Sequence, residues 1–125
     1  MNGYPAINKL FREQTVTVAA STTAAALSKE FSLTAGGATR ALRIEIDCGT
    51  VTGTVDVILQ QKLGESWSTV KTINPTTDVT NTIRMNNVVA ADQAYMPLAS
   101  ICRVVATTGV GEDIIVTGLR VLQEQ

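Results

Sequence analysis

The stretch Ala41–Cys48 alternates between apolar and charged side chains at every position after its first. Successive side chains of a strand point to opposite faces, so this spacing gives one apolar face and one charged face. A helix would scatter the same residues around its circumference. The pattern therefore predicts a strand of an antiparallel sheet that has one wet side. The next segment, Thr54–Gln61, alternates in the same way, and we expect it to pair with Ala41–Cys48 as a hairpin.

Other short segments follow this pattern and are separated by turns rich in glycine, asparagine and proline. Such spacing predicts an all-β fold, an antiparallel β-sandwich with either jelly-roll or immunoglobulin-like strand order. No helical period is long enough for the helical crossovers of a parallel sheet. Gly109–Gly111 is expected to be a hairpin turn. The further predicted strands are Thr15–Ala20, Leu27–Thr34, Trp67–Ile73, Val79–Met85 (an edge strand), Ser100–Thr107 and Asp113–Leu122.

The first fourteen residues differ from the rest, and we expect an N-terminal arm (1–14) preceding one β-sandwich domain (15–125). Ile7, Leu10 and Phe11 fall at helical spacing, so either a short helical turn or an extended arm fits the pattern. A segment this short needs a surface to cover. That surface could belong to its own domain or to a neighbouring subunit, and these three residues are therefore a candidate interface.

Three residues are the candidate core anchors: Trp67, Cys48 and Cys102. Trp67 is the only tryptophan, and its large area favours burial, although a Trp that stacks on sugar or contacts a partner is the alternative. Both cysteines lie on apolar faces of predicted strands, and two small buried thiols are favoured over a disulfide. The order Cys–Trp–Cys is also that of immunoglobulin domains, but Ser100 stands where a tyrosine corner needs Tyr.

Composition argues against several classes of function. The formal net charge is −1 and the chain has no histidine. A near-neutral chain lacks the basic field that attracts nucleic acid. The missing histidine removes the commonest general base and metal ligand, which argues against an enzyme, and no cofactor or metal is expected. No apolar run approaches the ~20 residues of a membrane helix, and Met1–Pro5 does not resemble a secretory signal. We therefore expect synthesis in a cytoplasm and no membrane association.

Three carboxylates are candidates for a chemical site. Asp47 and Asp56 are predicted on the outward faces of adjacent strands, with Glu45 nearby. Facing carboxylates can act as acid and base or bind calcium. Pairing with Arg43 across strands, or a solvated face, explains them equally well and is favoured, because no ligand-loop spacing is present.

Several blocks of the chain resemble small virion structural proteins of tailed bacteriophages in strand pattern. They are Phe31–Leu33, Leu42–Ile46, Gly53–Val57 with Ser66–Val70, and Ile101–Val105 with Leu119–Val121. The resemblance implies a non-enzymatic protein of the virion that decorates or cements a capsid. It also implies contacts with the major capsid protein or other virion proteins, and a homo-oligomer, with a trimer expected. The alternative is a carbohydrate- or receptor-binding β-sandwich module, including a neck, tail or head-fibre component.

Overall fold

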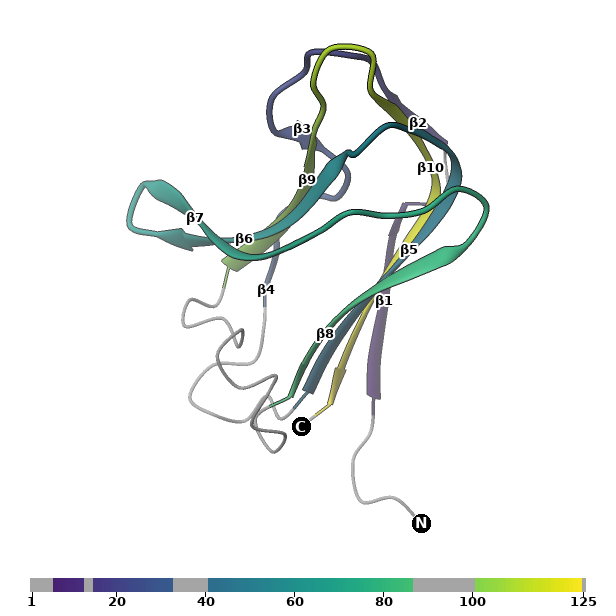
Figure 1. Cartoon of the computed structure of the whole chain (residues 1–125). Coiled ribbons are helices and arrows are strands. Elements are labelled where there is room, and N and C mark those ends of the chain that lie inside the picture. Colours follow the sequence, from purple (N-terminus) through teal and green to yellow (C-terminus); the bar gives the residue numbers. More distant parts are fainter. Residues whose placement is uncertain (1–5, 13–14, 33–40, 87–100, 125) are drawn as a thin grey trace.

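The computed structural model describes residues 6–12, 15–32, 41–86 and 101–124, with side chains for 15–32, 43–83 and 101–122. The described residues form ten strands and no helix. The strands make two antiparallel sheets that pack face to face (Figure 1). The predicted all-β sandwich is confirmed.

The first sheet has the strand order β1–β10–β5–β8. Its members are β1 (Ala6–Arg12), β10 (Asp113–Glu124), β5 (Ala41–Thr52) and β8 (Thr80–Asn86). The short strand β2 (Val16–Val18) also pairs with β10. β8 lies at one edge of the order, as its polar sequence predicts.

The second sheet has the strand order β3–β9–β6–β7. Its members are β3 (Ala25–Ala26), β9 (Ile101–Thr107), β6 (Asp56–Leu63) and β7 (Ser66–Ile73). β4 (Phe31–Ser32) also pairs with β9. Of the predicted strand Leu27–Thr34, residues 27–30 are not a strand, and residues 33–34 lie outside the described residues.

The strand order distinguishes a jelly roll from an immunoglobulin-like sandwich. The pairs β1–β2 and β3–β4 each occupy one position, so the ten strands fill eight positions numbered in chain order. In these numbers the strand order is 1-8-3-6 in the first sheet and 2-7-4-5 in the second. This is the strand order of a jelly roll, in which all connections except β6–β7 cross between the sheets. The sequence had left both orders open.

Two predicted hairpins are wrong. β5 pairs with β10 and β8, while β6 pairs with β7 and β9 in the opposite sheet. The turn Gly109–Gly111 likewise joins β9 of the second sheet to β10 of the first. Local alternation specifies which face of a strand is apolar, but two strands separated by a tight turn can belong to facing sheets and keep the same alternation.

Part of the predicted arm is a strand of the first sheet. β1 runs antiparallel to β10, with Leu10 opposite Arg120 and Ile7 opposite Gln123. Phe11 falls at an irregularity in this register. The backbone is therefore extended and paired with its own domain, not helical. The side chains of this candidate interface lie outside the described residues, and so do residues 87–100.

The core consists of the inward side chains of both sheets. Cys48 and Cys102 belong to it, one from each sheet, and both are free thiols. Their predicted burial is confirmed. The largest fully buried members are Leu27, Ile44, Ile46, Leu59, Ile83, Ile114 and Leu119.

Candidate functional site

Trp67 lies on the outer face of the second sheet and is not a core anchor. It is half-buried and does not belong to the core cluster. In the β6–β7 register it is directly opposite Lys62. Lys62 follows the buried Gln61, which shares the inner face of β6 with the core residue Leu59. Cross-strand partners share a face, so Trp67 must point outward with Lys62. The prediction of a core Trp rested on side-chain area and ignored this register.

Two cations contact the Trp67 ring. The guanidinium carbon of Arg103 lies 4.1 Å from the ring centroid, and the Lys62 Nζ lies 5.8 Å from it. Both distances are within the range of a cation–π interaction. Arg103 Nε also donates to Gln60 Oε1 at 2.8 Å, which fixes the guanidinium over the ring. We call Gln60, Lys62, Trp67 and Arg103 the Trp67 patch.

The Trp67 patch carries two positive charges. Among the described residues, neither Lys62 nor Arg103 forms a salt bridge. Ile101, which is 37% exposed, shares the face of Arg103 on β9, because the residue between them, Cys102, points into the core. An aromatic ring, an arginine and an exposed aliphatic side chain are the composition of a protein contact surface.

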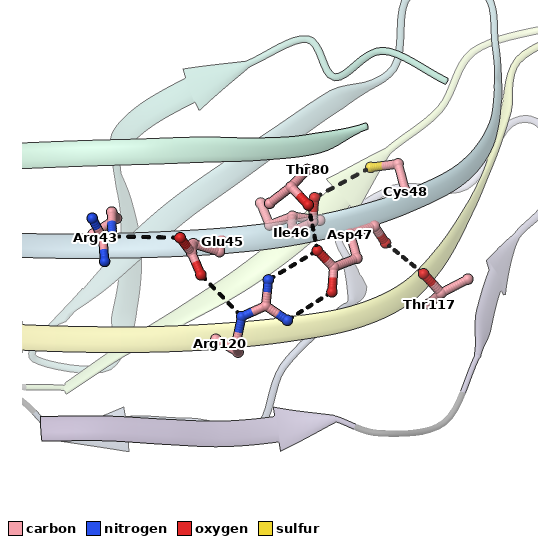
Figure 2. Close-up of polar contacts among 8 residues, drawn as sticks. All are labelled: Arg43, Glu45, Ile46, Asp47, Cys48, Thr80, Thr117 and Arg120. Atoms are coloured by element: carbon pink, nitrogen blue, oxygen red, sulfur yellow. Dashed lines mark hydrogen bonds and ion pairs between the residues drawn. The ribbon is translucent and has the colours of Figure 1, made fainter. Parts of the chain in front are cut away.

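The outer face of the first sheet carries a different arrangement, in which the charges satisfy one another (Figure 2). Arg120 Nη1 and Nη2 donate to the two carboxylate oxygens of Asp47 at 2.7 and 2.9 Å, and its Nε donates to Glu45 at 2.9 Å. Thr80 Oγ1 donates to Asp47 at 2.7 Å. Arg43 Nε lies 3.5 Å from Glu45 on the same strand.

We call Glu45, Asp47, Thr80 and Arg120 the Arg120 cluster, and its hydrogen bonds shift the pKa values of two of its members. The hydrogen bonds from Arg120 lower the pKa of Asp47, opposed by partial burial and assisted by the bond from Thr80. The hydrogen bonds to Asp47 and Glu45 raise the pKa of Arg120. The ionised forms of Asp47 and Arg120 are stabilised by each other, which is the signature of a structural ion pair. A general acid or base would need a carboxyl pKa closer to neutrality.

The carboxylates considered as an alternative site, Asp47 and Asp56, do not lie together. Asp47 lies on β5 of the first sheet, whereas Asp56 lies on β6 of the second and accepts a hydrogen bond from Asn74 Nδ2 at 2.7 Å. Their predicted adjacency depended on the β5–β6 hairpin and fails with it. In the described part of the chain, no group of three or more His, Cys, Asp or Glu side chains is arranged to hold a metal ion.

The two thiols are poorly suited to chemistry. Burial raises the pKa of Cys102 to about 12. Burial also raises the pKa of Cys48, against a hydrogen bond from Asn81. A buried thiol with a raised pKa is a weak nucleophile and behaves as a small apolar side chain.

The fold and these surfaces define an antiparallel jelly roll with an aromatic–cationic patch on one outer face. Comparison of the chain with protein families, with curated proteins and with solved structures finds no match. Among the described residues there is no helix with the length and apolarity to cross a membrane. The Trp67 patch is the candidate functional site.

Proposed function

We propose that the protein is a non-enzymatic structural component of a virion, most simply one that decorates or cements a phage capsid, and that it assembles through the Trp67 patch. One observation carries the proposal. The single Trp of the chain lies on an outer sheet face beside two cations that have no acidic partner among the described residues. Tryptophan and arginine are the residue types that dominate protein–protein binding energy.

The virion assignment rests on the resemblance in strand pattern to small phage structural proteins. The jelly-roll order is compatible with it, because capsid domains use this architecture. Lectins use it too, so the fold alone does not choose a function. The mechanism would be burial of interface area, which raises the free energy needed to dismantle the particle. The protein would be made in the host cytoplasm and incorporated into virions there.

Co-fractionation with particles tests the proposal. We expect the protein to migrate with virions in a density gradient prepared from the cells that make it, in many copies per particle. Trp67→Ala should remove most of it from the particle fraction. Thr82→Ala, an exposed position on the other sheet, is the matched control and should migrate as wild type. Absence of the wild-type protein from every particle fraction would overturn the proposal.

A carbohydrate- or receptor-binding module is the second candidate, and the outward position of Trp67 favours it. Sugars stack on an open aromatic face, however, and the guanidinium of Arg103 already lies over this ring. Because Trp67 is the only tryptophan, its fluorescence reports binding at the patch directly. A saturable fluorescence change on titration with a glycan would favour this second function over the first.

A further inference from the structure

The Trp67 patch is positively charged, and another surface of the same molecule is negatively charged. We propose that the patch binds the acidic loop end of a second copy of this chain, so that copies associate head to tail. This inference rests on the proposed role of the patch as a protein contact surface. It adds the identity of the partner.

Three loops gather at one end of the sandwich and form the acidic loop end, residues 49–56, 74–80 and 108–113. Hydrogen bonds join the first two: Thr77 Oγ1 donates to the Val51 carbonyl at 2.9 Å, and Asn74 Nδ2 donates to Asp56. The third lies against the first, because a Cβ added at Gly53 would approach the Glu112 side chain to 2.8 Å.

The charge of this end is entirely negative. Its loops contain Asp56, Asp78, Glu112 and Asp113 and no lysine or arginine. Among the described residues, none of these four acids forms a salt bridge. The acidic loop end therefore lacks internal countercharges, as the Trp67 patch does, but with the opposite sign.

The β9–β10 turn projects from this end and is suited to contact the Trp67 patch of a second copy. Val110 at its tip is 93% exposed, so its apolar side chain is available for contact with any surface that meets this end. The turn is held in shape, because Glu112 Oε1 accepts a hydrogen bond from the Gly109 amide at 2.6 Å and Gly111 takes a φ of 73°. A preformed turn loses little entropy when it binds.

The two surfaces complement each other but cannot meet within one molecule. The patch offers Lys62 and Arg103 beside Ile101, and the loop end offers acids beside Val110. Val110 lies seven positions after Arg103 along β9 and its turn, which corresponds to roughly 20 Å of extended chain. The contact would join different surfaces of two copies, and such heterologous contacts close into rings or continue as filaments.

Charge reversal tests the inference. We expect wild-type protein to self-associate in sedimentation velocity experiments, less strongly as salt is raised. Lys62→Glu and Asp113→Lys should each raise the dissociation constant about tenfold or more, because like charges then face each other. A 1:1 mixture of these variants, or the double variant in one chain, should recover association, since the reversed patch then faces the reversed loop end.

Matched controls separate a local contact from an effect of net charge. Lys29→Glu and Glu30→Lys make the same charge changes at exposed positions outside both surfaces, and they should associate as wild type does. A cooperative thermal transition in every variant establishes that each is folded.

Three results would overturn the inference: a wild-type monomer at all concentrations and salt levels, association that neither reversal weakens, or reversals that fail to rescue each other. A monomer whose binding to particles is nevertheless lost in Trp67→Ala would refute self-association and leave the proposed function standing. The partner of the patch would then be a different virion protein.

Discussion

At the scale of single residues, Arg120 shows why an outer sheet face can be charged and still stabilise the fold. Its planar guanidinium reaches two carboxylates at once, both oxygens of Asp47 and one of Glu45. A lysine offers no such fork. Asp47 and Glu45 project from the same face of β5, so their mutual repulsion is relieved by the one cation that lies between them.

The lowered pKa of Asp47 makes the free energy of unfolding depend on pH. A carboxyl whose pKa is lower in the folded than in the unfolded state contributes stability above its unfolded value, 3.8, and loses it as pH falls through the folded pKa. We expect the free energy of unfolding, measured with urea, to fall as pH drops below about 4. Asp47→Asn should lose stability at neutral pH and show a smaller acid-dependent fall.

Asp78→Asn is the control for that experiment, because Asp78 is exposed and forms no salt bridge among the described residues. It should retain the wild-type dependence on pH. If Asp47→Asn and wild type lose stability in parallel between neutral pH and pH 2, the Arg120–Asp47 pair does not contribute as its geometry indicates.

The outward position of Trp67 predicts a modest cost on truncation. Trp67→Ala loses a cation–π contact with Arg103 and a half-buried ring face, which together amount to about 1–2 kcal/mol. Leu59→Ala, a truncation in the core of the same sheet, should cost about 2–5 kcal/mol. Denaturant unfolding compares them. Equal costs would mean that Trp67 packs as a core residue.

At the scale of secondary-structure elements, the contact between β5 and β10 depends on one glycine. A Cβ at Gly118 would lie 2.8 Å from Asp47 Oδ2, and Arg120 prevents that carboxylate from moving away freely. We expect Gly118→Ala to destabilise by about 1–3 kcal/mol through this overpacking. The cost should largely disappear in an Asp47→Ala background, where the clashing carboxylate is absent.

A double-mutant cycle by thermal or urea unfolding measures this coupling. Gly49→Ala is the matched control on β5, because a Cβ there meets its nearest neighbours at an ordinary 3.7 Å. It should be close to neutral. Additive costs for Gly118→Ala and Asp47→Ala would show that the clash is not the cause.

The elements also show what the sequence can and cannot predict. Alternation correctly identified β5 as a strand with Ile44 and Ile46 inward and the charged residues outward, because the two-residue period is local. It did not identify the partner of β5, since pairing with β10 joins residues more than sixty positions apart. The Trp67 patch was missed for the same reason. Lys62, the cross-strand partner of Trp67, shows that Trp67 lies on the outer face, but this partner is known only when the β6–β7 register is known.

At the scale of the whole molecule, the chain is divided between two sheets by connections that cross from one to the other. Apart from the short links from β1 to β2 and from β3 to β4, only the β6–β7 hairpin stays within a sheet. Neither sheet can therefore keep its strands together while the other separates, and both share one core. This interleaving predicts that the two sheets unfold in a single cooperative step.

The two cysteines report that step independently. Cys48 lies in the first sheet and Cys102 in the second, both are buried, and the pKa of each is raised. In the folded protein a thiol reagent should reach neither, so modification requires unfolding. We expect mass spectrometry of labelled peptides to show equal labelling rates at the two sites, with both rates rising together in urea. Cys48→Ala and Cys102→Ala supply the single-site controls. Faster labelling of Cys48 alone would mean that the first sheet opens separately, and that the crossing connections do not couple the sheets.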